Sequence, residues 1–238
     1  MIFVKWRFFV KIKISMKYNI ITTQPGIYDS FLQTGLIARG IDRKIIGIDI
    51  HNLHDFAYDV HRSIDDTPYG GGPGMILRVD IIANALKSLR KKDTKVILLC
   101  PQGKKFTQAD AKRLAKEDNL VLIAGRFEGY DERIRDLVDE EISIGDFVLT
   151  SGDLPAMTII DATSRMIPGF IDKNESIQEE SFENNLLEYP QYTRPEVFEN
   201  KKTPEILLSG NHAEIAKWRK NEAVKRTQDR RPDLQSQT

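Results

Sequence analysis

Hydrophobic and polar residues follow two different periods along the chain. Apolar or alternating runs predict strands over residues 17–23, 44–53, 95–100, 120–125 and 142–149. Apolar residues that recur every three or four positions predict helices over residues 28–41, 81–92, 107–117, 131–138 and 154–167. Because strands and helices take turns, the pattern predicts a parallel α/β sheet covered by helices.

Three of the predicted helices have residues at their start that are typical of N-caps or of the first helical turn. Asp80 is typical of an N-cap, and Thr107 with Asp110 resembles a capping box. Pro155 is tolerated in the first turn of its helix.

The pattern changes after residue 171. Residues 172–181 are polar and predict a linker, and the segments beyond are short, interrupted by prolines and helical in pattern. The clearest helix covers 211–226, with Asn211 and Glu214 as cap and N3 partner. Seven Lys or Arg residues stand in 217–231 against two acids, with Trp218 among them. This favours nucleic acid as a partner over the simpler reading of an exposed charged helix.

Composition narrows the function classes. Lys plus Arg and Asp plus Glu each total 35, so any polyanion site has to be a local patch. The single cysteine, Cys100, excludes an internal disulfide and a multi-cysteine zinc site, and it suits a cytosolic protein. No run of 18 apolar residues predicts a membrane span. Charges interrupt the apolar N-terminus, so we expect an extension over 1–15, with Met16 as an alternative start, rather than a signal peptide.

A glycine-rich stretch, TPYGGGPGM, occupies residues 67–75. It lacks the Lys-Ser/Thr pair of a phosphate-binding loop, and we expect no strand directly beside it, so a phosphate cradle is disfavoured. The four histidines show no spacing typical of a metal site, and we predict none.

Three short glycine-bearing loops follow predicted strands: PQGKKF after 95–100, GRFEGYDER after 120–124 and TSGDLPAM after 142–149. Ligands of open parallel sheets bind outside the carboxyl ends of the strands. Glycine lets backbone N–H and C=O groups reach a ligand edge such as adenine. The alternative is that turns between strands and helices commonly contain glycine without binding anything.

Together these segments resemble the bacterial tRNA (guanine-N1)-methyltransferases, the TrmD family. The resemblance rests on eight stretches in the family's order that cover nearly everything after Met16: DVHRSIDDTPYGGGPGM, PQGKKF, AGRFEGYDERI, VDEEISIGDFVLTSGDLPAM, SRMIPG, ESIQEESF, YTRPEVF and PEILLSGNHAEIAKWR. It implies a SPOUT-class α/β fold, a parallel sheet with a deep trefoil knot, plus a small α-helical C-terminal domain. The domains implied are an extension over 1–15, a knotted cofactor-binding domain over 16–172, a linker over 173–182 and a tRNA-binding domain over 183–238.

The resemblance also implies the chemistry and its residues. S-adenosylmethionine would give a methyl group to N1 of the tRNA guanosine at position 37, in a homodimer whose sites use both subunits, with a need for Mg²⁺. Glu180 would be the general base and Arg165 would stabilise guanine O6, while Asp65 and Gly74 would lie near the substrate. The implied cofactor-binding residues are Leu99, Cys100, Pro101, Gly125, Glu128, Ile144, Gly145, Asp146, Phe147, Val148, Leu149 and Gly152.

Three features depart from the family pattern. Glu180 replaces the family's aspartate and is one methylene longer, Ser151-Gly152 replaces Gly-Gly, and ITTQPGIYDSF replaces a more hydrophobic stretch. Two alternative functions stay open: an RNA-binding protein with reduced activity, and a SPOUT methyltransferase that modifies another RNA position.

Overall fold

The structure, a computed structural model, describes residues 14–172 and 180–235. Contacts divide the chain into two compact units, Met1–Ile171 and Asp172–Thr238. Most of the predicted N-terminal extension and most of the predicted linker lie outside the described residues.

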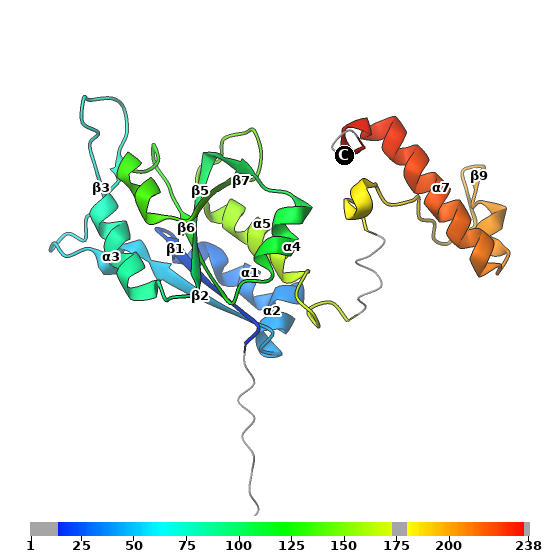
Figure 1. Cartoon of the computed structure of the whole chain (residues 1–238), viewed down its shortest axis with the longest axis horizontal. Coiled ribbons are helices and arrows are strands. Elements are labelled where there is room, and N and C mark those ends of the chain that lie inside the picture. Colours follow the sequence, from blue (N-terminus) through cyan, green and yellow to red (C-terminus); the bar gives the residue numbers. More distant parts are fainter. Residues whose placement is uncertain (1–13, 173–179, 236–238) are drawn as a thin grey trace, which may run out of the picture. The chain divides into compact units, whose positions relative to one another are not determined.

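The first unit is built on a five-stranded sheet in the order β2-β1-β6-β5-β7, and every neighbouring pair is parallel (Figure 1). The prediction of a parallel α/β sheet is therefore confirmed. The strands are β1 (Met16–Thr22), β2 (Ile46–Asn52), β5 (Thr94–Lys105), β6 (Asn119–Ala124) and β7 (Glu140–Ser143).

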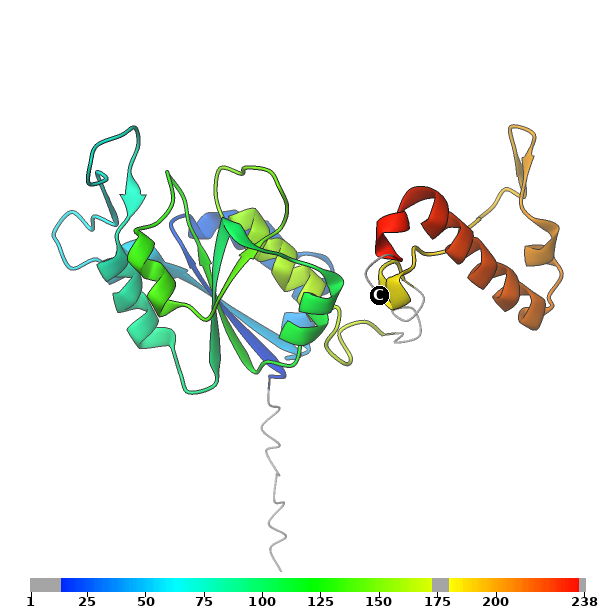
Figure 2. The ribbon, with the colours of Figure 1, turned by 45° about the horizontal axis from the view of Figure 1, so that its top comes forward.

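Helices cover both faces of the sheet, α3 on one side and α4 with α5 on the other (Figure 2). Alternate residues of β6 explain why: Leu120 and Leu122 join one buried core, while Val121 and Ile123 join the other. The helices of the unit are η1 (Pro25–Tyr28), α1 (Asp29–Gln33), α2 (Gly35–Asp42), η2 (Leu53–Phe56), α3 (Val79–Leu89), α4 (Gln108–Leu114), η3 (Glu132–Leu137) and α5 (Asp153–Ser164).

Several predicted elements differ in extent. The single helix expected over 28–41 is interrupted at Thr34, which is extended, so η1, α1 and α2 take its place. The helix expected over 131–138 is the short 3-10 helix η3. Asp80 is not the N-cap of α3; Arg78 is, and Asp80 in the first turn pairs with the Arg78 guanidinium. The capping box of Thr107 and Asp110 is confirmed at the start of α4.

Two predictions at the carboxyl edge of the sheet are also wrong. PQGKKF is not a loop, because β5 continues to Lys105 with a register shift between Leu99 and Lys104. The strand expected over 142–149 ends at Ser143, after which the chain leaves the edge of the sheet. The glycine-rich stretch does adjoin strands, since β3 (Asp65–Asp66) and β4 (Ile76–Leu77) pair antiparallel on either side of it.

The second unit is organised around the long helix α7 (His212–Arg230), whose N-cap is Asn211 as predicted. Thr227 receives a hydrogen bond from the Leu187 amide at 2.8 Å, and the Arg219 guanidinium lies 4.8 Å from the Tyr189 ring centroid. These contacts hold the segment before the helix against it. The other elements are η4 (Glu183–Asn185), β8 (Val197–Phe198), β9 (Lys201–Lys202), η5 (Glu205–Leu208) and η6 (Pro232–Leu234). Among the described helices, none combines the length and the apolar character needed to cross a bilayer.

Candidate functional site

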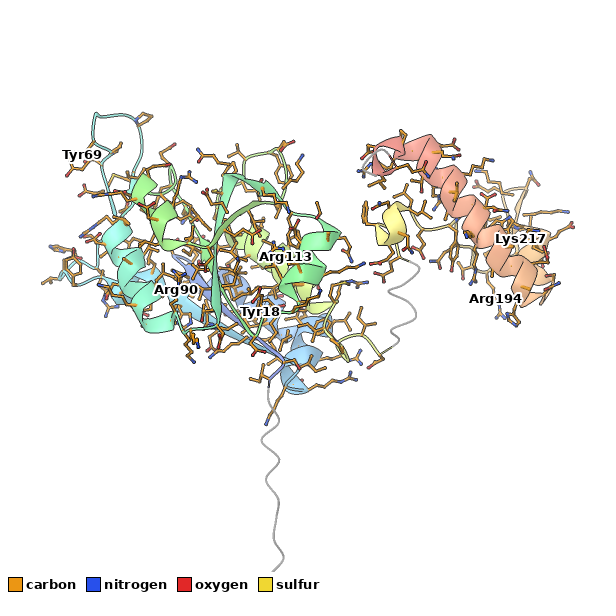
Figure 3. The ribbon with its side chains drawn as sticks, viewed as in Figure 1. Tyr18, Tyr69, Arg90, Arg113, Arg194 and Lys217 are labelled. Atoms are coloured by element: carbon orange, nitrogen blue, oxygen red, sulfur yellow. The ribbon has the colours of Figure 1, made fainter. Side chains whose placement is uncertain are left out.

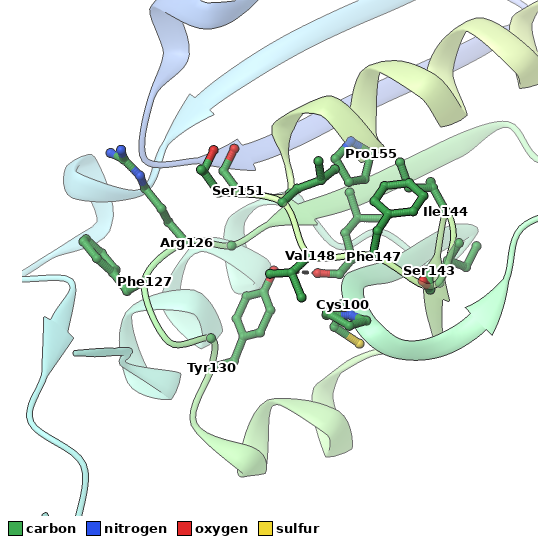
Figure 4. Close-up of a pocket in the computed structure, with 18 of the residues that line it drawn as sticks. Cys100, Arg126, Phe127, Tyr130, Ser143, Ile144, Phe147, Val148, Ser151 and Pro155 are labelled. Atoms are coloured by element: carbon green, nitrogen blue, oxygen red, sulfur yellow. Dashed lines mark hydrogen bonds between the residues drawn. The ribbon is translucent and has the colours of Figure 1, made fainter. Parts of the chain in front are cut away.

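A cavity of about 250 Å³ opens where β6 and β7 end, beside the middle of β5 (Figure 4). Its walls come from three segments that are distant in sequence: the middle of β5, residues 125–130 after β6, and residues 142–152, which begin in the last two residues of β7. This is the edge at which parallel sheets bind ligands.

All the residues expected to hold a cofactor line this cavity, except one. Asp146 does not line it; this side chain is exposed and pairs with Lys105 at 2.6 Å. The expected residues that the structure brings together are Leu99, Cys100, Pro101, Gly125, Glu128, Ile144, Gly145, Phe147, Val148, Leu149 and Gly152.

Other lining residues were not among those expected to bind the cofactor, and they include Arg126, Phe127, Tyr130 and Pro155, together with Ser151, which the sequence marked only as a departure from the family pattern. The stretch GRFEGYDER contains the first three, so the loop was identified but not its individual side chains.

Tyr130 links the middle of β5 to the end of β6 beside the cavity. Its hydroxyl lies 3.1 Å from the Leu99 carbonyl of β5 and 3.0 Å from the Ile123 carbonyl of β6, with one proton to share between them. Burial raises the pKa of this phenol well above its ordinary value. Tyr130 therefore stays neutral at physiological pH and acts as a donor rather than as a base.

Glycine is required where the segment after β7 meets the end of β6. The Gly152 amide donates to the Gly125 carbonyl at 2.8 Å, and a Cβ on Gly152 would lie 2.9 Å from the Ala124 Cα and the Gly125 nitrogen. Since β5 lies between β6 and β7, residues 144–152 cross over β5 to make this contact. The crossing closes one wall of the cavity.

A buried carboxylate anchors the end of the same segment. Asp153, 1% exposed in the first turn of α5, accepts hydrogen bonds from the Thr22 hydroxyl at 2.7 Å and the Tyr28 hydroxyl at 2.8 Å. A carboxylate at a helix N-terminus also interacts favourably with the helix dipole. Both donors lie in ITTQPGIYDSF, so polar residues in that stretch form the support for the cavity wall.

The glycine-rich stretch is attached to the opposite wall. The Glu128 amide donates to the Met75 carbonyl at 3.0 Å, and the Leu77 amide donates to the Gly129 carbonyl at 2.9 Å. Gly74 has a φ of +79°, and a Cβ there would lie 2.4 Å from the Glu128 Cγ.

The rest of the stretch stands away from the cavity. Asp65 lies in β3 opposite Leu77, and Tyr69 is fully exposed on the loop (Figure 3). The stretch is thus the outer side of a cavity wall and does not line the cavity.

Arg165 and Glu180 do not line this cavity. Arg165 follows α5 at the end opposite Gly152, and twelve helical residues span about 18 Å. Glu180 belongs to the second unit and lines a separate cavity of about 170 Å³ with Tyr189, Arg219 and Lys220.

The described residues contain no group of three His, Cys, Asp or Glu side chains arranged to hold a metal ion. His51 contacts the Asn19 amide oxygen at 3.1 Å, and the Nδ1 atom of His54 lies 2.9 Å from the Arg62 carbonyl. The Cys100 thiol donates to Glu141 at 3.2 Å. These three side chains have structural partners.

The parallel sheet and the cavity at its carboxyl edge define an α/β protein of the open-sheet class, in which ligands bind beyond the carboxyl ends of the strands. The family model described as tRNA (Guanine-1)-methyltransferase TrmD matches residues 16–237, and the chain belongs to this family.

Curated relatives agree, each named tRNA (guanine-N(1)-)-methyltransferase. The protein from Citrifermentans bemidjiense is 49% identical over 92% of this chain and 89% of its own. The protein from Dictyoglomus turgidum is 46% identical over 94% and 91%, and the protein from Lactobacillus johnsonii is 50% identical over 92% and 90%.

Proposed function

We propose that this protein transfers a methyl group from S-adenosylmethionine to N1 of the guanosine at tRNA position 37, directly 3′ of the anticodon. One observation carries the proposal. In a chain of this family, the residues expected to bind the methyl donor converge, with the exception of Asp146, on one cavity at the carboxyl edge of the sheet.

The residues of the cavity fit the donor. Leu99, Ile144 and Leu149 offer apolar surface, and the glycines at 125, 145 and 152 keep side chains away from backbone polar groups. The backbone of residues 144–149 would bind the adenine edge. The bound donor supplies a methyl group already activated on a sulfonium, so the protein has mainly to orient the two reactants.

The acceptor nitrogen has to lose its proton. A carboxylate can take that proton while an arginine stabilises the negative charge that develops on O6, and we assign these roles to Glu180 and Arg165. We expect Glu180→Gln to abolish methyl transfer while binding of the donor, measured by calorimetry, persists. Near-normal turnover of this variant would remove Glu180 from the mechanism.

We further propose that the protein works as a homodimer with shared active sites and has the SPOUT-type knot. The position of Arg165, one helix length from the cavity of its own chain, supports a site completed by a second subunit. The crossing of residues 144–152 over β5 supports the knot.

Two tRNA transcripts that differ only at residue 37 test whether the methyl group is transferred to that nucleotide. With labelled donor, the transcript with guanosine at 37 should accept a methyl group, and the one with adenosine should not. Equal labelling of both transcripts would place the modification elsewhere. Binding of tRNA without any transfer would favour the alternative of an RNA-binding protein.

A further inference from the structure

The second unit carries a hairpin that packs against little else. Strands β8 and β9 pair antiparallel, Val197 opposite Lys202 and Phe198 opposite Lys201, and the Thr203 amide extends the ladder to the Glu196 carbonyl at 2.9 Å. Every residue from 191 to 202 is exposed. The hairpin stands away from α7 as a narrow ribbon (Figure 2).

Its apolar side chains lie open to solvent. Phe198 is 62% exposed, Tyr192 is 50% exposed and Val197 is 47% exposed. An isolated two-stranded hairpin is marginally stable in water, and exposed aromatic rings on it gain nothing from burial. These side chains are therefore placed to be covered by a partner.

The turn of the hairpin supports the same view. Glu199 and Asn200 both have positive φ, +47° and +62°, which the two-residue turn of this type requires. Asparagine tolerates this conformation, but glutamate adopts it at a cost. Strain of this kind commonly persists where a segment serves a binding role.

The charges on the hairpin identify the class of partner. Lys201 and Lys202 are adjacent on one strand, so their side chains project to opposite faces of the ribbon. Both are exposed, and within the described residues neither ammonium group forms an ion pair. A ribbon with an aromatic ring and an ammonium group opposite each other suits RNA, in which a base or ribose lies beside phosphates.

We propose that the β8–β9 hairpin is a tRNA-binding surface, on which Phe198 stacks against a base or ribose and Lys201 and Lys202 contact phosphates. The inference rests on the proposed function, since tRNA is the RNA that the enzyme would meet. It adds a contact surface formed by residues of the second unit, whereas residues of the first unit line the donor cavity.

Two variants and one control test the proposal on the full-length protein. Phe198→Ala removes the ring, the double variant Lys201→Gln with Lys202→Gln removes two charges, and the double variant Lys91→Gln with Lys92→Gln is the control. The control pair is also adjacent and exposed, but it follows α3 in the first unit. The Kd for unmodified tRNA is measured by filter binding at several salt concentrations with S-adenosylhomocysteine present, alongside the Tm, the solution mass and methyl transfer.

We expect both hairpin variants to raise the Kd by about fivefold or more, with an unchanged Tm, while the control changes it little. A plot of the logarithm of the tRNA association constant against the logarithm of the salt concentration has a negative slope. The magnitude of this slope should decrease by about 1.5 in the lysine double variant and should not change in Phe198→Ala. These two signatures separate phosphate contacts from stacking.

An unchanged Kd in both hairpin variants would overturn the inference, and so would a changed solution mass, which would make the hairpin an interface between copies. A wild-type protein that binds tRNA without methylating it would contradict the proposed function while leaving the hairpin result valid. A wild-type protein that binds no tRNA would contradict both.

Discussion

At the scale of single residues, Asp110 shows how one carboxylate joins a helix to the sheet. Its side chain is 4% exposed and accepts hydrogen bonds from the Thr107 hydroxyl at 2.7 Å, Lys104 at 2.8 Å and Arg113 at 3.2 Å. Burial alone would raise the pKa of Asp110, but these hydrogen bonds outweigh it and lower the pKa to about 2. The ionised form is therefore the form that stabilises the fold.

The lowered pKa of Asp110 predicts how the free energy of unfolding changes with pH. Because the pKa of Asp110 is lower in the folded chain, its stabilisation is complete above about pH 4 and is lost as the pH falls towards 2. Asp110→Asn should reduce the free energy of unfolding by about 2 kcal/mol at pH 7, and the difference from wild type should shrink as the pH falls below 4. Urea unfolding from pH 7 to pH 3 measures this. The exposed Asp93→Asn serves as control, and a difference that grows on acidification would contradict the assignment.

Tyr130 allows a second test at this scale. Tyr130→Phe keeps the ring that supports the cavity but leaves two buried carbonyls with one donor fewer. We expect a loss of about 1 kcal/mol in unfolding free energy and a weaker affinity for S-adenosylmethionine by calorimetry. An unchanged donor affinity would mean that the hydroxyl does not shape the cavity.

At the scale of elements, the contact of Gly152 with the end of β6 is the part of the site that tolerates least change. A Cβ at this position meets backbone atoms, which cannot move aside as a flexible side chain can. Gly152→Ala should therefore lower the free energy of unfolding by about 1–3 kcal/mol and abolish donor binding. Gly26→Ala is a matched control, since its Cβ would meet only the Asp29 carboxylate at 3.9 Å. Full donor binding by Gly152→Ala would contradict the close packing of this wall.

The sequence predicts these elements well where the signal is local. The run LVLIA is β6, and the Thr107–Asp110 spacing is a true capping box. The prediction fails where contacts between distant segments determine the extent of an element. For example, β5 continues through Pro101 to Lys105 because the shifted register lets it pair with β7 beyond the bulge. The Thr22–Asp153 and Tyr28–Asp153 hydrogen bonds link residues more than 120 positions apart, and no local pattern indicates them.

For the candidate site, the family motifs indicated most of the residues that line the cavity, while the place of Tyr130 became visible only in the fold. Asp146 is the one expected cofactor-binding residue whose side chain lies away from the cavity. It lies in the middle of the expected run 144–149, but its side chain turns to Lys105 on β5, away from the cavity. A run of residues cannot indicate which of its members faces inward once the strand has ended.

At the scale of the whole molecule, the proposed dimer can be tested by combining two different inactive variants in one dimer. If the partner supplies Arg165 to each cavity, then Arg165→Gln removes the partner's contribution, while Ser151→Tyr places a ring at a position that lines the cavity itself. Each variant alone should be inactive, but mixed dimers should regain about a quarter of wild-type activity, because half the dimers carry one intact site. Co-refolded or co-expressed mixtures measure this, and no recovery would place Arg165 and the cavity in the same subunit's site.

Identification of the methylated nucleoside shows directly whether this protein is a tRNA (guanine-N1)-methyltransferase that acts at position 37. Unmodified tRNA is incubated with the wild-type protein and S-adenosylmethionine, digested, and analysed by mass spectrometry against nucleoside standards, with Glu180→Gln run in parallel. We predict 1-methylguanosine, mapped to position 37, and none with the variant. A methyl group on a ribose or on another base, or no methylation of any tRNA, would contradict the account.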